Sequence, residues 1–451
     1  MRRVIRQTLD GWVDPAAAFA ALYADAPAAF WLDSGSGSTE GISYLGAAAR
    51  VATAEDLAGG VLPFLRRELA ADSIEADAAA PGFALGWVGW LGYELRAETM
   101  GVAVDRTSRY PDAALMFVDR ALAFDHAAGT VTLLSLEHDQ EWVASVTTAL
   151  RAAPAPQVVP PPRRTSRWRY TDAEYLSMIR SCMHAIADGE AYQLCLTTEA
   201  TIDTAASTDG APEPFETYLA LRASSPTHHG AYLTVDGVSV LGSSPERFLS
   251  VSPAGAIESK PIKGTRARGA TPAEDESLKR ELLSSDKERA ENLMIVDLMR
   301  NDIGRVAAIG SVSVPSLLAI ESYAQVHQLV STVRGVLADG LTGVDAVAAC
   351  FPAGSMTGAP KLSATRILDG LEQRARGIFS GALGYFGLDG AIDLAMVIRS
   401  IVIDEKGATV GAGGGITALS VPEEELAEVR LKAAALLRVL GVRERTSGRT
   451  V

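Results

Sequence analysis

Apolar residues along this chain follow two spacings, one typical of helices and one typical of strands. Apolar residues three or four positions apart predict helices, whereas short apolar runs bounded by glycine and proline predict strands. Because the two kinds of pattern alternate without a visible internal repeat, we expect an α+β or α/β sandwich with large, partly antiparallel sheets. The predicted helices span 16–23, 54–69, 172–188, 215–223, 285–300, 343–350, 359–373 and 421–440, and the predicted strands span 114–124, 131–136, 192–198, 231–235, 239–241, 381–388 and 394–403.

A proline-rich segment interrupts this pattern at 153–164. Closely spaced prolines favour an extended connection and exclude a helix. The break therefore predicts an N-terminal α/β region over 1–152, a linker over 153–164 and a C-terminal domain over 165–451.

Two of the predicted helices carry explicit start signals. Ser285 stands three residues before Glu288, and Ser420 stands three residues before Glu423, which is the spacing of a capping box. Pro422 suits the first position of the second helix, and Gly441 suits its end.

Composition and charge exclude several classes of protein. Of the 451 residues, 48% are hydrophobic and 21% are charged, which is typical of a folded globular protein. The net charge of −14 argues against nucleic acid as a partner, because phosphate backbones are bound by an excess of cations. The longest uncharged stretch, 78–93, is too short and too rich in glycine to span a bilayer. Charged residues interrupt any apolar leader near the N-terminus, so we expect no membrane association and a cytoplasmic location.

The cysteines offer no nucleophile or metal site. Cys182, Cys195 and Cys350 are too few and too widely spaced for a disulfide framework, so we expect reduced thiols. Cys182 and His184 are two apart on a predicted helix and cannot face each other. Clusters of cysteine and histidine that would hold zinc are absent from the sequence.

Paired carboxylates recur on the two capped helices. Glu288 and Glu291 share one helical face, and Glu425 and Glu428 share another. Such pairs suit Mg²⁺, which takes one or two carboxylates and leaves positions for substrate and water. By spacing alone, a solvated acidic face explains them better.

Two further segments have a chemical and a plain interpretation. Residues 258–269 gather Lys260, Lys263, Arg266 and Arg268, and neighbouring cations lower the pKa of a lysine, which favours a neutral amine nucleophile. The plain interpretation is an exposed basic loop. The glycines of 411–415 predict a turn whose backbone N–H groups could hold a carboxylate, or a turn without function.

Taken in order, these segments resemble the chorismate-utilising enzymes, most of all the branch that makes 4-amino-4-deoxychorismate. The resemblance covers roughly 170–440. It rests on SPERF (244–248), PIKGTRARG (261–269), RAENLMIVDLMRNDIGRV (289–306), LVSTVRG (329–335), FPAGSMTGAPK (351–361), GALGYFG (381–387), IRS (398–400) and GAGGGI (411–416).

The resemblance implies a fold of large, mostly antiparallel sheets flanked by helices, with a central cleft for chorismate, a dicarboxylate. It implies Mg²⁺ held by Glu291 and Glu428, with Glu288 and Glu425 supporting them. Glu246 would be the general acid that protonates the departing hydroxyl, and Lys263 the covalent nucleophile. The remaining substrate-binding residues would be Gln193, Thr265, Thr357, Tyr385, Arg399, Gly413, Gly414, Gly415 and Lys432.

Two positions discriminate among the family's activities. Gln193 stands where members that add water carry a lysine base, which disfavours isochorismate and salicylate synthases. Lys263 stands where anthranilate synthases carry alanine, which favours attack by Lys263 on the ring, loss of hydroxyl and displacement of the lysine by ammonia. The family usually has histidine immediately before Leu-Val-Ser, whereas here Gln328 stands there and His327 one residue earlier.

The expected function is therefore Mg²⁺-dependent amination of chorismate for p-aminobenzoate and folate synthesis. Ammonia would come from a separate glutamine amidotransferase subunit, because the chain lacks an activated cysteine. Anthranilate synthase component I is the nearest alternative, and isochorismate or salicylate synthase a more distant one. A chorismate-binding structural partner is the alternative outside enzymes.

Overall fold

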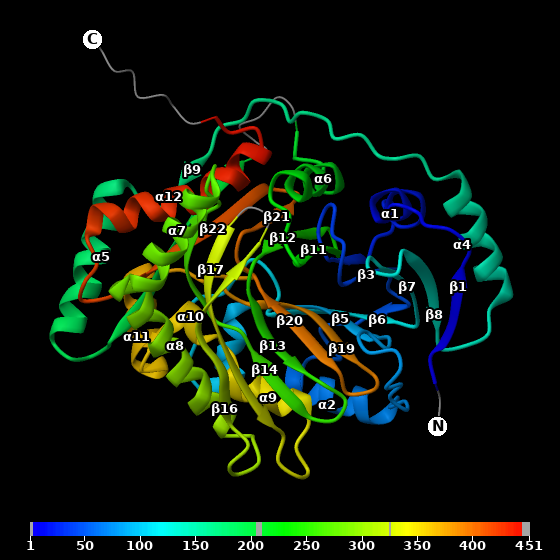
Figure 1. Ribbon diagram of the computed structural model, residues 1–451, viewed down its shortest axis with the longest axis horizontal. Helices are drawn as coiled ribbons and strands as arrows, with labels where there is room; N and C mark the ends of the chain where they lie inside the picture. The colour runs from blue at the N-terminus through cyan, green and yellow to red at the C-terminus, as the bar shows by residue number, and fades with distance from the viewer. Residues whose placement is uncertain (1–2, 204–209, 324–325, 444–451) are drawn as a thin grey trace.

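Two large β-sheets packed face to face form the centre of the molecule, and helices cover the outer face of each (Figure 1). The computed structural model describes residues 3–203, 210–323 and 326–443. Strand pairings within the two sheets of this described part are antiparallel. The expected sandwich of helices and large sheets is confirmed.

Within the described ranges, the first sheet has twelve strands. Their spatial order is β1 (Ile5–Leu9), β8 (Thr130–Ser135), β7 (Arg120–Asp125), β3 (Ile42–Ala47), β2 (Ala29–Asp33), β11 (His229–Val235), β12 (Val238–Ser244), β21 (Ser400–Asp404), β22 (Gly407–Ile416), β10 (Gln193–Asp203) and β18 (Gly358–Ala359), with β9 (Arg167–Trp168) also paired to β10.

The second sheet has ten strands. Their order is β15 (Ile262–Ala267), β17 (Val326–Val336), β14 (Ala256–Ser259), β13 (Arg247–Val251), β20 (Ile392–Met396), β19 (Ala382–Gly387), β5 (Gly86–Leu91), β6 (Ala113–Val118) and β4 (Arg50–Val51), with β16 (Ser313–Ser322) also paired to β17.

Helices cover the outer face of each sheet. The first sheet packs against α1 (Pro15–Leu22), α4 (Gln140–Ala152), α5 (Asp172–Ala187), α6 (Pro214–Ser224), α11 (Lys361–Glu372) and α12 (Pro422–Val439). The second packs against α2 (Val61–Ala71), α8 (Asp286–Gly304), α9 (Gly343–Cys350) and α10 (Gly354–Thr357). The described helices also include η1 (Tyr93–Leu95), α3 (Arg96–Met100) and α7 (Pro272–Ser284). The helices of the described residues are too short or too polar to cross a membrane.

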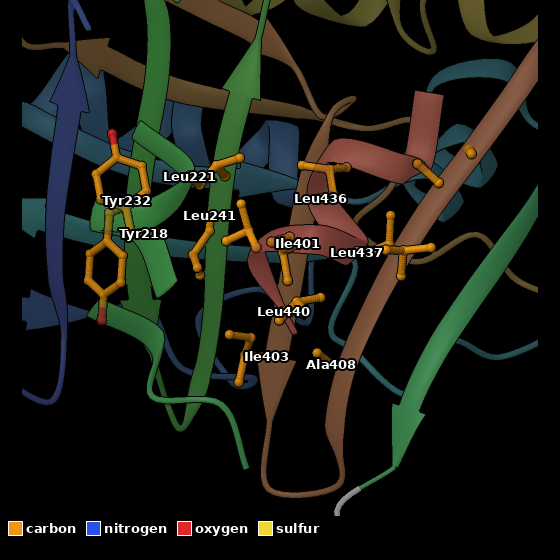
Figure 2. Close-up of a cluster of buried hydrophobic side chains, with 14 of the residues drawn as sticks. Tyr218, Leu221, Tyr232, Leu241, Ile401, Ile403, Ala408, Leu436, Leu437 and Leu440 are labelled. Carbon is orange, nitrogen blue, oxygen red and sulfur yellow. The ribbon is translucent and has the colours of Figure 1, made fainter. Parts of the chain in front are cut away.

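Alternation along the strands produces separate cores on the two faces of each sheet. On β5, Trp87 and Leu91 face the helices, whereas Val88 and Trp90 face the other sheet. Figure 2 shows part of the core on the helical side of the first sheet, where Leu436 of α12 lies near Ile401 of β21. Strands buried on both faces explain why these segments are apolar throughout.

The segments before and after the proline-rich linker share both sheets. Strand β2 pairs with β11 in the first sheet, and β5 pairs with β19 in the second. The predicted division at 153–164 remains a prediction about chain organisation. In space, the described parts on either side contribute strands to the same two layers.

Most predicted elements occur near their expected bounds, but three were wrong in extent. The predicted strand 114–124 is β6 followed by β7, and 394–403 is β20 followed by β21. At each break the chain passes from one sheet to the other, which an unbroken apolar run cannot reveal. The predicted helix 54–69 begins only at Val61, after turns over 54–59.

The start signals of the two capped helices had different outcomes. Ser285 does cap α8, because its side chain accepts the N–H of Glu288. The predicted cap at Ser420 is wrong, since α12 starts at Pro422 and the hydroxyl of Ser420 instead donates to Glu425 at 2.7 Å. That hydroxyl serves the carboxylate rather than the helix end.

A buried ion pair joins several of these elements. Glu372 at the end of α11 accepts hydrogen bonds from Arg376 and from the backbone N–H and hydroxyl of Thr197 in β10. Arg376 also donates to the carbonyls of Met356 and Cys195. Both charged side chains are 3% exposed or less.

The backbone around Arg376 also reaches the first part of the chain. Glu94 accepts the N–H groups of Arg376 and Gly377, each at 2.8 Å. The Arg376 guanidinium lies 4.4 Å from the ring centroid of Tyr93, a cation–π contact. The pair therefore fixes η1, α10, α11 and β10 relative to one another.

We predict that Glu372→Gln destabilises the protein by about 3–5 kcal/mol, because it leaves the Arg376 charge buried without its partner. Thermal and urea unfolding followed by circular dichroism would measure the loss. Glu423→Gln, which removes one partner of the exposed Arg180–Glu423 pair, is the control and should change stability little. Equal effects of the two changes would contradict the role given to the buried pair.

Candidate active site

A cavity of about 990 Å³ lies where the two sheets meet helices α8 and α12. Its wall includes residues of β10 and β22 from the first sheet and of β15 and β17 from the second. The volume is at the upper end of the range typical of small-molecule sites. Apart from histidines, the charged side chains that line the cavity are six acidic and five cationic ones.

One wall of the cavity is a strand of glycines. Residues 411–415, predicted as a turn, belong to β22 and pair with β10, so that prediction was wrong. Beyond Val410 the strand has β10 on one side only, because β21 pairs no further. A β-carbon on Gly413 would come within 2.7 Å of the Leu196 carbonyl, and one on Gly411 would overlap the ring of Phe379. Glycine is therefore required by close packing here rather than by a turn.

The four paired glutamates line this one cavity from two helices. Glu288 and Glu291 come from α8, and Glu425 and Glu428 come from α12. The interpretation as a solvated acidic face is wrong for three of them, whose side chains are 21% exposed or less. Glu428 is more open, at 45%.

Each of these carboxylates faces a cation. The nearest N···O distances are 3.8 Å for Lys263–Glu291, 3.6 Å for Arg266–Glu288, 2.8 Å for Lys287–Glu425 and 2.7 Å for Lys432–Glu428. Burial raises the pKa of Glu291 despite the nearby Lys263. Burial also acts to raise the pKa of Glu428, but Lys432, Lys287 and Lys263 together outweigh burial, and the pKa of Glu428 is lowered.

Lys263 points into the cavity from β15 rather than into solvent. Its side chain is 14% exposed, so the exposed-loop interpretation is wrong for this residue. The expected cause of a lowered pKa is also wrong: burial lowers the pKa of Lys263, but Glu291 and other acidic groups outweigh burial and raise it. The neighbouring cations have carboxylate partners of their own, namely Glu321 for Lys260, Glu281 and Glu288 for Arg266, and Asp275 for Arg268.

Glu246 is a buried acid in the same wall. It is 8% exposed and follows β12. Burial raises its pKa to about 7, although Lys263 and the hydroxyl of Ser355 act in the opposite direction. A carboxyl group with such a pKa holds a proton near neutral pH, which a general acid needs.

Arg399 is a further cation in the cavity wall, and the acidic group that acts on its charge is Glu428. Arg399 lies between β20 and β21 with a φ of +51°, a left-handed conformation that is uncommon for a residue with a side chain. Burial lowers the pKa of Arg399, yet a guanidinium stays charged. Lys432 differs, because its Nζ donates to the Gly413 carbonyl at 3.0 Å and pairs with Glu428.

The structure does not bring every predicted residue to the cavity wall. Thr265 lines it, whereas Thr357 is fully buried beside it and donates its hydroxyl to the carbonyl of Ala353. Tyr385 lies in the core between the two sheets, with its ring 5.0 Å from that of Phe83. An apolar motif gives no indication of which face of β19 a tyrosine occupies.

The Gln328 and His327 pair is separated by strand alternation. Gln328 lines the cavity, whereas His327 is fully buried and contacts Ser322 and Asp275, each at 2.8 Å. The imidazole therefore joins β17 to α7, and an amide occupies the cavity-facing position.

Sequence reasoning missed several lining residues, including Lys287, Ser355 and Phe379. Lys287 stands next to Glu288 in the sequence and could have been proposed as a partner for a carboxylate on another helix. Ser355 and Phe379 carry no signal that distinguishes them from core residues.

Comparisons with known proteins show the family to which the chain belongs. Residues 27–438 match the family model described as chorismate binding enzyme. An aminodeoxychorismate synthase of Streptomyces pristinaespiralis is 44% identical over 95% of this chain, and one of Streptomyces griseus is 44% identical over 97%. The chain spans 64% of the length of each of these two relatives. Anthranilate synthase component 1 of Streptomyces coelicolor is 36% identical over 96% of this chain and 87% of its own length.

Solved structures give the same fold. Anthranilate synthase component I from Streptococcus pneumoniae superposes with a TM-score of 0.73 and 25% identity, covering 96% of this chain and 92% of its own. The menaquinone-specific isochorismate synthase MenF from Escherichia coli superposes with a TM-score of 0.72, covering 98% of this chain and 95% of its own. At 18% identity, the second likeness concerns the fold alone.

We predict that Gly411→Ala destabilises the protein by about 1–3 kcal/mol, because the added methyl group must displace the ring of Phe379 from the cavity wall. Thermal unfolding would measure the change. Gly370→Ala in α11 is the control, since nothing lies near its added methyl group and alanine favours a helix. If Gly411→Ala is as stable as Gly370→Ala, the packing argument for the glycine strand fails.

Proposed function

Because this chain belongs to the family of chorismate binding enzymes, we propose that it aminates chorismate to 4-amino-4-deoxychorismate, a precursor for p-aminobenzoate and folate synthesis. The observation that carries the proposal is the presence of Lys263 and Glu246 in the wall of one cavity, a buried amine and a buried acid whose pKa is about 7. The identity to aminodeoxychorismate synthases supports it.

The proposed reaction uses these two groups in sequence. Neighbouring acids raise the pKa of Lys263, so its amine first gives up a proton to one of those carboxylates. The freed amine then forms a bond to the conjugated ring, the double bonds shift, and the C–O bond to the ring hydroxyl breaks as Glu246 supplies a proton, so water leaves. Ammonia then bonds to the carbon that lost the hydroxyl, the double bonds shift back, and the bond to Lys263 breaks. Chorismate and ammonia are thereby converted into aminodeoxychorismate and water.

The charges of the cavity favour a bound cation. The five cationic side chains of the wall do not outnumber its six acidic ones, so the wall has no excess positive charge for a dicarboxylate. The donor set fits Mg²⁺, which binds oxygen ligands. Glu291 and Glu428 would hold the ion, as the resemblance implies, and would exchange their contacts with Lys263 and Lys432 for it. Glu425 is held by both Lys287 and Ser420. When bound, Mg²⁺ would neutralise one carboxylate of the substrate. Arg399 and the open edge of the glycine strand would bind the second carboxylate.

A glutamine amidotransferase subunit is the proposed source of ammonia. Burial raises the pKa of the Cys182 and Cys350 thiols to about 12 and also raises that of Cys195. Glutamine hydrolysis by a cysteine requires an activated thiolate, which these thiols do not supply.

Anthranilate synthase activity is the second candidate, because the chain spans most of the length of the Streptomyces coelicolor protein. Lys263 argues against anthranilate synthesis. A covalent nucleophile is needed only when ammonia enters at the same ring carbon that the hydroxyl has left.

We predict that the purified chain with chorismate, Mg²⁺ and ammonium gives aminodeoxychorismate, identified by mass and absorbance, and gives none with glutamine alone. Without ammonia, the peptide containing Lys263 should gain a chorismate-derived mass, and Lys263→Ala should gain none. Anthranilate as the product, or equal labelling of the variant, would contradict the proposal.

We predict that Glu291→Gln and Glu428→Gln each weaken Mg²⁺ binding at least tenfold, because each removes a negative charge from the ion. Calorimetric titration in the presence of chorismate would measure binding independently of turnover. Glu423→Gln, on the exposed side of α12, is the matched control. Unchanged Mg²⁺ affinity in both cavity variants would refute the ligand assignment.

We predict that kcat/KM for chorismate falls about tenfold per pH unit above pH 7, at a constant concentration of unprotonated ammonia. The pKa of Glu246 is raised to about 7, so its proton is present below that pH and is lost above it. Glu246→Gln should lower the rate by about 10²–10⁴ and abolish this limb of the profile. A variant that keeps the wild-type pH profile would rule out Glu246 as the acid.

A further inference from the structure

A serine, a histidine and an aspartate beside the cavity form a chain of hydrogen bonds. Ser322 ends β16, His327 lies opposite it in β17, and Asp275 lies in the first turn of α7. Oγ of Ser322 is 2.8 Å from Nδ1 of His327, and Nε2 of His327 is 2.8 Å from Oδ1 of Asp275. Such a chain is the arrangement of a serine nucleophile, its base and the group that orients the base.

The direction of these hydrogen bonds follows from the carboxylate. Hydrogen bonds from Arg268 are the main cause of a lowered pKa of Asp275, so the carboxylate is ionised and only accepts. Nε2 of His327 therefore carries a hydrogen, and in a neutral imidazole Nδ1 is then left with its lone pair. The hydroxyl of Ser322 must donate to that lone pair, which is the path by which a general base takes a proton.

The three residues differ in exposure as a nucleophilic site requires. His327 is fully buried, so its Nδ1 is kept from bulk water, whereas Ser322 is exposed and open to a reagent. Asp275 is held by Arg268, which donates from Nε and Nη2 at 2.8 and 3.0 Å, and by the N–H of Gly269 at 2.8 Å. The base and its orienting group are thus fixed before a reagent arrives.

The charges around Ser322 indicate which electrophile it can meet. Asp275 contacts its histidine, and Glu321 precedes it in β16. The cations next to these carboxylates, Arg268 and Lys260, are already paired with them, at 2.8 and 2.7 Å. An anionic phosphoryl donor would be repelled by the carboxylates, whereas an uncharged acyl ester would not.

We propose that Ser322 is a nucleophile activated by His327 and Asp275, and that it accepts an acyl group from an activated carboxylic ester. Oγ forms a bond to the carbonyl carbon as its proton passes to Nδ1 of His327. The bond from that carbon to the leaving oxygen then breaks, and the proton passes from Nδ1 to this oxygen. The products are acyl-Ser322 and the released alcohol or phenol. The site uses none of the groups assigned to the proposed amination and does not depend on it.

The test is acetylation of the purified chain by p-nitrophenyl acetate at about pH 8, where an ordinary imidazole is neutral. Peptide mass spectrometry would locate each modified residue and follow its rate. Ser313, an exposed serine at the opposite end of β16, is the internal control. Ser322 should be acetylated about 10²-fold faster than Ser313, because its hydroxyl donates to an imidazole. Ser322→Ala should remove this adduct and leave the acetylation of Ser313 unchanged.

A second variant tests the base. His327→Gln keeps polar atoms beside Ser322 and Asp275, but an amide takes no proton, so acetylation of Ser322 should slow about 10²-fold. A wild-type rate in this variant, with folding verified by circular dichroism, would overturn the proposal. Equal rates for Ser322 and Ser313 in the wild type would mean that the hydrogen bonds only join β17 to α7, and would overturn it as well. That comparison needs no variant, so it decides even where His327→Gln does not fold.

Discussion

The buried pair of Glu372 and Arg376 is the interaction on which the site's geometry depends. Two opposite charges removed from water must be satisfied in full, and here the surrounding backbone does so through Thr197, Cys195 and Met356. These groups belong to β10 and α10, which reach the cavity. The same hydrogen-bond network continues to Glu94, so a residue from the N-terminal part of the chain helps to fix elements that line the cavity.

The cavity is bounded by the open edge of the first sheet and by two helices that carry charged side chains. The glycines of β22 remove the side chains that would otherwise fill the space, and α8 and α12 fill part of it with carboxylates. Those carboxylates are balanced by cations from three elements, β15, α8 and α12. A balanced wall has little net field, so the attraction of the cavity for an anion depends on individual groups rather than on overall charge.

The pKa of Lys263 depends on residues that lie near it in space rather than on those that lie near it in sequence. Three cations lie within five residues of it along the chain, yet each is paired with a carboxylate elsewhere. The groups that decide its protonation are Glu291 and other acids contributed by distant segments.

The sequence by itself determined the local structure and the chemical inventory. Apolar spacing predicted most helices and strands, Ser285 marked a helix start, and the motifs around Glu246, Lys263 and Glu291 identified the residues that share a cavity. Only the tertiary structure decided where the chain changes sheets, that the glycines of 411–415 form a strand, and that Tyr385 lies in the core while Gln328 faces the cavity. The reason is physical: spacing along the chain fixes which residues share a face of one element, whereas burial, pKa and pairing depend on which faces of distant elements meet.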